Sequence, residues 1–391
     1  MENAFIPLSV PNLKGNELKY ITAAVESEWV STAGPYVTKF EEAVAEYTGV
    51  PHAVSCQNGT AGIHIALLLA GVTSEDIVLV PTLTFIAAVN PVRYIQAEPI
   101  FLDCDDTLCL DPVKLRDFCK TQCTFKNGRL LDNISGKHIK ALIVVHVFGN
   151  MANLEEILEI AQMYNIKVIE DATEALGTYY LDGPYAGLHA GTLGVLGVYS
   201  FNGNKIITSG GGGMIVSQDE ALLKKAKHFT TQAKSDEVNF FHDEVGFNYR
   251  LTNLQAALGL AQLEQLEDFI ETKIASYGHY EQAIREIPHV RLYPFRSDVR
   301  SNHWFYSLYL EDEFPLSRDE VVEYFTKCNI QTRPIWGLIH EQLPYRQSRT
   351  YKIVKAITYQ NRIVNIPCST NITKEELYRV ITCLKEMVGE R

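Results

Sequence analysis

The sequence predicts an α/β fold with a large domain around a mostly parallel β-sheet and a smaller α+β domain at the C-terminus. Between about residues 50 and 217, short apolar runs rich in β-branched residues alternate with helix-length segments, which is typical of successive β-α units. At 391 residues and 46% hydrophobic, the chain is long enough for two packed domains. We therefore expect a large domain over residues 1–255 and a small domain over residues 256–391.

The apolar runs of the large domain predict the strands of its sheet. Between two of them, Leu154, Ile157, Leu158 and Ala161 recur at helical spacing, which predicts a helix packed on the sheet by one apolar face. Connections of this kind are right-handed crossovers. The expected strands are, in chain order, Ala53–Cys56, Ile77–Val80, Pro99–Asp103, Ala141–His146, Lys167–Asp171, Gly197–Phe201 and Gly213–Ser217.

Two further segments have recognisable patterns. The polar stretch of residues 120–140 contains Asn-Gly and Ser-Gly turns, which predicts a surface excursion between two core elements. A second amphipathic run predicts one long helix that leaves the large domain. Its apolar positions are Leu263, Leu266, Ile270, Ile274 and Tyr277.

Composition and charge exclude several classes of protein. The formal net charge of -12 and the lack of a Lys/Arg cluster argue against nucleic-acid binding. No segment approaches the roughly 20 apolar residues needed to span a bilayer, and the N-terminus has no export signal. The eight cysteines show no metal-type pairing, so we expect reduced thiols in a cytoplasmic protein with no bound metal.

The segment around Lys205 carries the strongest chemical signal. Lys205 follows the strand that ends at Ser200 and Phe201, and a run of four glycines begins at Gly210. An amine just past a buried strand, beside flexible backbone, suits covalent bonding to a carbonyl cofactor. A solvated loop lysine next to a glycine turn is the alternative that this segment alone leaves open.

Carboxylates follow the end of another expected strand. Asp171 ends the run Val168–Asp171, and Glu174 lies three residues farther on. In α/β sheets this edge usually faces a ligand, and an aspartate there can pair with the protonated pyridine nitrogen of pyridoxal phosphate (PLP). A carboxylate near the reacting atoms can also accept a hydrogen bond or move a proton. Both residues could instead cap a turn.

Three other segments supply candidate contacts. Gly59, Thr60 and Ala61 stand between a strand and a helix, where exposed N–H groups can bind a phosphate, although an ordinary β-α turn fits equally well. Phe85 follows a strand end and could stack on a flat ring or pack in the core. The guanidinium of Arg250, in Asn248-Tyr249-Arg250, suits a carboxylate or phosphate, and a surface ion pair is the alternative. We find no Walker loop, serine-hydrolase elbow or dinucleotide-binding glycine motif.

Taken in order, these segments resemble the DegT/DnrJ/EryC1/StrS sugar aminotransferases over nearly the whole chain. The resemblance implies PLP fold type I, the aspartate-aminotransferase-like fold, with PLP as cofactor. It assigns the Schiff-base role to Lys205, the pyridine-nitrogen contact to Asp171 and ring stacking to Phe85. It assigns the cofactor phosphate to Gly59, Thr60, Ala61 and Ser200.

The resemblance also implies a homodimer with shared active sites. In the family, the segment that matches Asn248 comes from the neighbouring subunit and contacts the phosphate, while Arg250 matches a position that can hold the carboxylate of the amino donor. Ser31 and Thr32 lie where the family lines the cleft for the sugar nucleotide.

Within the family, the runs Ser200–Thr208 and Glu170–Gly177 resemble 4-aminotransferases that make UDP-N-acetylbacillosamine and legionaminic-acid precursors. This implies a UDP-linked 4-keto-6-deoxy-N-acetylglucosamine as substrate, L-glutamate as donor and 2-oxoglutarate as by-product. Asn202, Thr173 and Gly211 depart from the broad family pattern. The departures at Asn202 and Gly211 also occur in this subgroup, whereas the departure at Thr173 does not match it.

Three other functions remain open at this stage. A PLP-dependent sugar dehydratase of the same fold would have histidine in place of Lys205. A PLP-binding regulator would normally carry a nucleic-acid-binding module. An enzyme acting on a free amino acid would need the cofactor residues but no nucleotide pocket.

Overall fold

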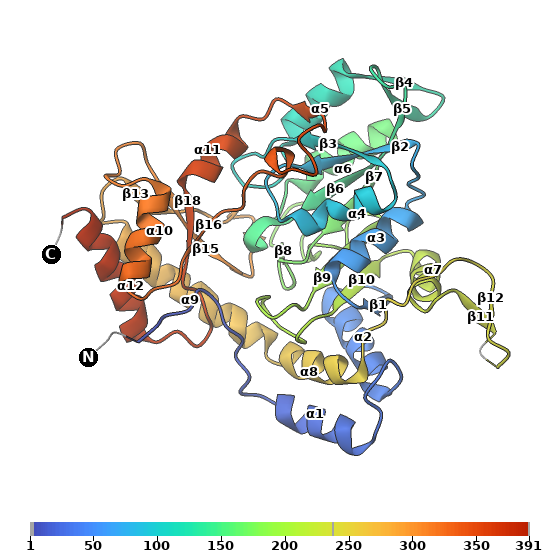
Figure 1. The fold of residues 1–391 in the computed structure, drawn as a ribbon, viewed down its shortest axis with the longest axis horizontal. Helices are drawn as coiled ribbons and strands as arrows, with labels where there is room; N and C mark the ends of the chain where they lie inside the picture. The colour runs from blue at the N-terminus through green and yellow to red at the C-terminus, as the bar shows by residue number, and fades with distance from the viewer. Residues whose placement is uncertain (1–3, 237, 390–391) are drawn as a thin grey trace.

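The computed structural model describes residues 4–236 and 238–389, and one large sheet forms its centre (Figure 1). The sheet has the order β1-β10-β9-β7-β6-β2-β3-β17, and the β4–β5 hairpin joins it through β6. Along this path β10 pairs antiparallel with both of its neighbours, while the other pairings are parallel. The predicted mostly parallel sheet is therefore confirmed. Its strands are β1 (His52–Cys56), β2 (Asp76–Pro81), β3 (Glu98–Leu102), β4 (Cys123–Lys126), β5 (Arg129–Asp132), β6 (His138–Val145), β7 (Lys167–Asp171), β9 (Leu196–Ser200), β10 (Gly213–Ser217) and β17 (Thr350–Tyr351).

All seven strands expected from the sequence are present. Strands β7 and β10 have the predicted bounds, and the ends of the others lie within three residues of the predicted ones. Strand β2 is buried along its whole length, which explains its nearly continuous apolar run. The segment of residues 120–140 contains the β4–β5 hairpin and the start of β6, and the hairpin joins the sheet by pairing with β6.

Helices pack around the large sheet. The predicted apolar face on α6 is confirmed, because Leu154, Ile157 and Ala161 are buried and Leu158 is partly buried against the core. The helices of this part of the chain are α1 (Glu17–Glu26), α2 (Pro35–Thr48), α3 (Gly59–Leu69), α4 (Asn90–Tyr94), α5 (Pro112–Thr121), α6 (Leu154–Tyr164) and α7 (Glu220–Thr230), with short 3₁₀ turns η1 (Ile86–Ala88) and η2 (Val147–Gly149).

The long helix expected after the large domain is present over Leu266–Ile284, but two details of the prediction are wrong. The chain forms two helices, α8 (Asn253–Leu263) and α9 (Leu266–Ile284), because Gln265 between them has a non-helical backbone. Ile274, placed on the apolar face by the sequence pattern, is exposed. The buried face of α9 instead includes Lys273, a residue type that a hydrophobicity pattern counts as polar.

A second sheet, of order β13-β15-β18-β16, lies in the C-terminal part of the chain. The N-terminal segment joins this part, since Ile6 pairs with Ile330. Strand β17 crosses back to the large sheet beside β3. The division into domains at residue 255 stays a prediction. The remaining elements are β8 (Tyr179–Tyr180), β11 (Lys234–Asp236), β12 (Phe241–His242), β13 (Val290–Leu292), β14 (Val299–Arg300), β15 (Tyr306–Leu310), α10 (Arg318–Lys327), β16 (Arg333–Pro334), η3 (Ile339–Glu341), α11 (Lys355–Arg362), β18 (Ile363–Ile366) and α12 (Lys374–Met387).

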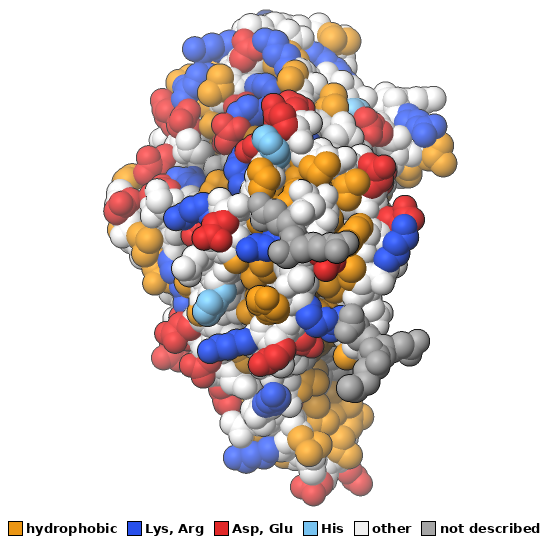
Figure 2. Space-filling model, turned by 90° about the vertical axis from the view of Figure 1, so that its left-hand side faces the viewer, with side chains coloured by type: hydrophobic (Ala, Val, Ile, Leu, Met, Phe, Trp, Pro, Cys, Tyr) orange, Lys and Arg blue, Asp and Glu red, His pale blue; other side chains and the backbone are white. Residues whose placement is uncertain are grey.

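The surface of the end that carries both termini is mixed in character. Figure 2 shows acidic and basic side chains interspersed over this face, with hydrophobic side chains between them. All eight cysteines are free thiols. None of the described helices is long and apolar enough to cross a membrane.

Candidate active site

A cavity of about 360 Å³ opens where strands of the large sheet end. Its volume falls in the range of about 300–1,000 Å³ that is usual for small-molecule sites. Carboxyl ends of parallel strands meet at one edge, so residues distant in sequence converge there. Of the residues singled out from the sequence, the cavity is lined by Gly59, Thr60, Phe85, Asp171, Glu174, Ser200 and Lys205.

Lys205 lies in the loop that follows β9, and its side chain is 12% exposed. A turn positions it, because its backbone N–H donates to the carbonyl of Asn202 at 3.0 Å. Its Nζ lies 3.7 Å from Glu174 Oε1. Lys205 therefore lines the cavity beside a carboxylate. It is not the solvent-exposed loop lysine that the sequence alone left open.

Asp171 is the last residue of β7 and is buried. Its Oδ1 accepts a hydrogen bond from the backbone N–H of Thr173 at 3.1 Å. Burial raises the pKa of Asp171, while Thr173 and the charge of Lys205 act in the opposite direction. A buried carboxylate of this kind is stabilised in its charged form by a cation, such as a protonated ring nitrogen.

Glu174 is buried next to Lys205 and is held from a second side. Its Oε2 accepts the backbone N–H of Phe148 at 2.8 Å. Phe148 has φ 57°, a left-handed backbone that is rare for a bulky residue and is often found at functional sites. Burial raises the pKa of Glu174 to about 7, against the opposing effect of Lys205. A carboxyl group with this pKa can hold or release a proton near neutral pH.

The N-terminus of α3 lies at the cavity, where a helix start can bind an anion. Asn58 caps the helix, its Oδ1 accepting the N–H of Ala61 at 2.8 Å and its carbonyl accepting the N–H of Gly62 at 3.1 Å. Gly59 and Thr60 line the cavity, and their N–H groups belong to the first turn of the helix, where they have no partner within the helix. Ala61 is buried and does not line it.

The surroundings of Gly59 explain why no side chain fits there. A Cβ at this position would lie 2.8 Å from Thr173 Cγ2 and 3.2 Å from Ser200 Cβ. The approach of an anion to the start of α3 is therefore left to the backbone and to the Ser200 hydroxyl. With Asp171 and Lys205 at the same cavity, these residues fit PLP: a phosphate cradle, an acidic partner for the ring nitrogen and an amine for the carbonyl carbon.

Besides Ala61, four predicted residues lie outside this cavity in the same chain. Thr32 and Arg250 line a second cavity of about 320 Å³ together with Lys227 and Lys234. Asn248 Oδ1 accepts a hydrogen bond from Arg250 Nε at 3.3 Å. The carbonyl of Ser31 accepts the backbone N–H of Asn253 at 2.5 Å. One chain thus brings most of the predicted cofactor residues to the first cavity, whereas Asn248, predicted to contact the phosphate, and the predicted substrate residues lie elsewhere.

The sequence patterns did not identify the aromatic wall of the first cavity. Trp304, Phe305 and Trp336 come from the C-terminal part of the chain, more than 90 residues beyond Lys205. No local motif surrounds them, because their role depends on how that part packs against the large sheet. Phe85, at 54% exposed, lies at the same cavity.

The model of the DegT/DnrJ/EryC1/StrS aminotransferase family matches residues 11–385. The chain belongs to this family. The aminotransferases of this family use PLP, so the cofactor predicted from the sequence is confirmed. None of the departures at Asn202, Gly211 or Thr173 removes a residue with a predicted role.

Similar proteins support the family assignment along the whole chain. EpsN from Bacillus subtilis (strain 168), named as a pyridoxal phosphate-dependent aminotransferase, is 38% identical over 97% of this chain and 95% of EpsN. A GDP-perosamine synthase from Caulobacter vibrioides is 35% identical over 98% of both chains. A solved DegT/DnrJ/EryC1/StrS aminotransferase from Brucella abortus has a TM-score of 0.86 and 25% identity, with 96% of each chain covered. The predicted PLP fold type I is thereby confirmed.

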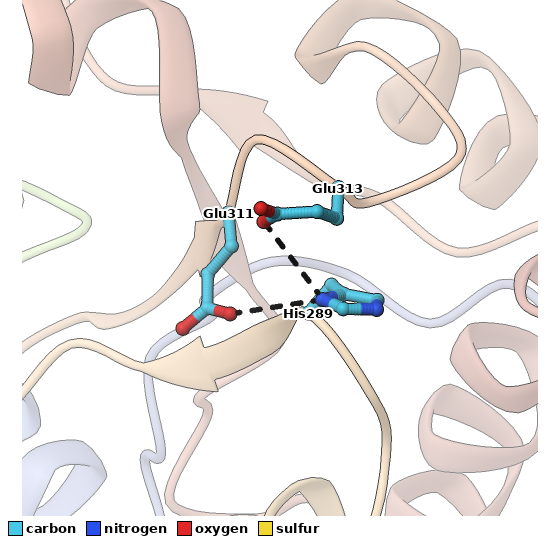
Figure 3. A group of neighbouring side chains, drawn as sticks. All are labelled: His289, Glu311 and Glu313. Atoms are coloured by element: carbon cyan, nitrogen blue, oxygen red, sulfur yellow. Dashed lines mark ion pairs between the residues drawn. The ribbon is translucent and has the colours of Figure 1, made fainter.

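A separate group of titratable side chains lies outside both cavities (Figure 3). His289 Nδ1 lies 4.0 Å from Glu311 Oε2 and 3.9 Å from Glu313 Oε2. All three residues are exposed, and exposed ion pairs of this kind contribute little to stability. We assign no ligand to this group.

The raised pKa of Glu174 predicts a pH-dependent stability. Between the pKa of an unfolded glutamate and about 7, the folded chain holds a proton that the unfolded chain has lost, so stability falls as the pH rises through this window. The unfolding free energy at pH 5 minus that at pH 8 should be lower in Glu174→Gln than in the wild type by about 1–3 kcal/mol. Thermal unfolding of the cofactor-free protein measures it. Glu271→Gln on the exposed side of α9 is the control, and an equal change in both variants would contradict the prediction.

Proposed function

We propose that this enzyme transfers an amino group from L-glutamate to a UDP-linked 4-keto-6-deoxy-N-acetylglucosamine. The products are the 4-amino sugar nucleotide and 2-oxoglutarate, for precursors of bacterial surface glycans or nonulosonates. The convergence of Lys205, Asp171 and the start of α3 on one cavity supports the transamination chemistry. The choice of sugar nucleotide and donor rests on the runs Ser200–Thr208 and Glu170–Gly177, which resemble 4-aminotransferases of UDP-linked N-acetyl sugars. That the chain is a sugar aminotransferase follows from its family; the nucleotide, sugar and donor are the proposal.

Each residue of the cavity has a separate task in this chemistry. When bound, PLP supplies an electron sink for the negative charge that develops at the reacting carbon. Asp171 pairs its carboxylate with the proton on the ring nitrogen. The N–H groups of Gly59 and Thr60 bind the phosphate. Lys205 Nζ would hold the cofactor through its carbonyl carbon, and the free amine would move the proton at the reacting carbon.

Glu174 is assigned to the half of the reaction that involves the sugar. Its carboxyl group lies within 3.7 Å of Lys205 Nζ and can accept a hydrogen bond from the sugar or exchange a proton. In Glu174→Gln, we expect amination of the keto sugar to slow by about 100-fold while the glutamate half-reaction stays within a few-fold of wild type. Stopped-flow spectra follow the two halves separately. Equal slowing of both halves, or of neither, would remove this role.

A GDP-linked sugar is the second candidate substrate. The observation in its favour is the 35% identity to a GDP-perosamine synthase over 98% of this chain. The test is to incubate the PLP-loaded protein and glutamate with 4-keto-6-deoxy sugars linked to UDP, GDP and TDP, and to detect products by mass spectrometry. Amination of the UDP-linked N-acetyl sugar alone supports the proposal. Preferential amination of the GDP-linked sugar would replace it with the second candidate, and no amination of any member would refute both.

We propose that the active unit is a homodimer that completes each site. Asn248 and Arg250, which lie outside the first cavity of their own chain, would then contact the phosphate and the donor carboxylate in the partner's site. The β11–β12 hairpin precedes this segment and projects from the body (Figure 1). It carries exposed apolar residues, including Phe240 and Phe241. These exposed apolar side chains lie close in the chain to Asn248 and Arg250, which would have to reach the other subunit. We therefore expect a second copy of this chain to cover them.

Removing the apolar surface of this hairpin should weaken the dimer. Burial of a Phe side chain stabilises by roughly 1.5–3 kcal/mol, so Phe240→Ser combined with Phe241→Ser should raise the dimer dissociation constant at least about tenfold. Sedimentation velocity measures this shift, and turnover should fall as monomer accumulates. Phe125→Ser, at an exposed Phe on the β4–β5 hairpin, is the matched control. Full turnover by a monomer would contradict the shared site.

A further inference from the structure

Trp304 contacts the loop that follows β9 through both its ring face and its indole N–H. The centroid of its ring lies 4.1 Å from Lys205 Nζ, in the geometry of a cation–π contact. Its indole Nε1 donates a hydrogen bond to the carbonyl of Asn204 at 2.7 Å. One side chain thus contacts the amine of Lys205 and the backbone of the residue before it.

The backbone of Trp304 is fixed by polar contacts on two sides. Its N–H donates to Asn302 Oδ1 at 3.0 Å, and its carbonyl accepts Lys273 Nζ at 2.9 Å. The Asn302 amide also donates to the carbonyls of Glu174 and Leu176, both at 2.9 Å. The turn that carries Glu174 and the segment that carries Trp304 are therefore held together by one buried side chain.

Packing leaves the Trp304 ring little freedom. Phe305 stacks on it at a centroid separation of 4.0 Å, and Phe148 lies 6.2 Å away. Trp304 itself is only 2% exposed. A ring held in this way loses little further conformational entropy when it contacts a cation. A cation–π contact also strengthens when water is excluded.

The two partners of the Lys205 amine differ in chemistry. Glu174 offers a carboxylate at 3.7 Å, and Trp304 offers an aromatic face at 4.1 Å. The aromatic face attracts the ammonium but neither accepts nor donates its protons. An amine resting there stays within the cavity, available to the cofactor, even when Glu174 is protonated.

We propose that Trp304 is a positioning residue for Lys205, with its ring face holding the free amine and its indole N–H holding the Asn204 carbonyl. This deepens the proposed function, because it concerns the same site, but it does not depend on which nucleotide sugar is bound. Trp304 thereby couples the C-terminal part of the chain to the loop after β9. A residue that only fills space would affect neither the reactivity of the amine nor the order of the loop specifically.

The first test measures the Lys205 amine in the full chain without cofactor. Acetylation by trace acetic anhydride, mapped by peptide mass spectrometry, reports how readily each lysine amine reacts, with the exposed Lys224 as internal reference. Trp304→Leu should speed acetylation of Lys205 about tenfold, equivalent to about 1.4 kcal/mol of lost stabilisation of the ammonium. Trp304→Phe keeps an aromatic face and should stay within about threefold of wild type.

The second test separates the hydrogen bond from the ring. Trp304→Phe removes the donor to Asn204, so amide hydrogen exchange in residues 202–207 should quicken about tenfold or more, as expected for the loss of one buried hydrogen bond. Trp336→Leu is the control for both tests, because Trp336 lines the same cavity but its ring contact is with Phe148. It should change neither readout.

Three results would overturn the proposal. They are unchanged acetylation of Lys205 in a folded Trp304→Leu protein, an equal increase in Trp336→Leu, and unchanged exchange of residues 202–207 in Trp304→Phe. If Trp304→Leu fails to fold, the exchange measurement on Trp304→Phe decides alone. Both readouts are obtained without substrate, so a wrong choice of nucleotide sugar leaves them intact.

Discussion

Replacing Lys205 with alanine is expected to remove the visible absorption band of the PLP-loaded protein and to lower turnover by at least about 1,000-fold. The band requires the covalent bond between the lysine amine and the cofactor, and the turnover requires the same amine to move a proton at the reacting carbon. Lys205 is the lysine that lines the cavity with Asp171 and Ser200 among the described residues. Absorption spectra and single-turnover rates at matched cofactor occupancy measure the two effects.

The control for this substitution is Lys224→Ala, which removes an exposed lysine on α7. It should retain the band and the turnover, because its amine pairs with Glu220 on the surface of the helix. A band that persists in Lys205→Ala would move the covalent role to another lysine. Loss of the band with retained turnover would separate covalent attachment from proton transfer.

The meeting of Asp171, Lys205 and Gly59 at one cavity could be predicted from the sequence because each of them stands at or after the end of a strand. Asp171 ends β7, Lys205 follows β9 and Gly59 follows β1. An apolar run marks each strand, and the topology of a parallel sheet brings their carboxyl ends to one edge. Short motifs therefore give the position of these residues without knowledge of the tertiary packing.

The aromatic wall of the cavity could not be predicted in this way. Trp304 and Trp336 reach the cavity only through the packing of the C-terminal part against the large sheet, and no periodic pattern encodes that contact. The buried Lys273 illustrates the same limit, since its ammonium is accommodated by the carbonyls of Trp304 and Cys368. Partners 31 and 95 residues away along the chain satisfy it, so its own helix gives no sign of its burial.

The substrate side has a different limit. Arg250 and Thr32 were singled out individually, and the structure places them at one cavity separate from that of Lys205. If the dimer is the active unit, the complete site exists in no single chain. Sequence motifs can identify its parts, while their relative positions depend on the symmetry of the dimer.

Replacing Asp171 with asparagine should keep the cofactor bound but lower turnover by about 100- to 1,000-fold. Asparagine preserves the shape and the hydrogen bond from Thr173, and it removes only the negative charge opposite the ring nitrogen. Without that charge the ring nitrogen loses its proton more easily, and the electron sink weakens. Spectra should show a retained band with slowed half-reactions on both sides of the exchange.

Thr173→Ala separates the charge of Asp171 from its surroundings. This variant keeps the carboxylate and the backbone N–H that contacts it, and it removes only the threonine side chain, so its turnover should fall far less than that of Asp171→Asn. Burial alone raises the pKa of Asp171, so a carboxylate with no cation opposite it would tend to take up a proton and would be replaced by asparagine at little cost. Near-normal turnover in Asp171→Asn would therefore mean that no cation faces this residue during the reaction, and the ring nitrogen would need another partner.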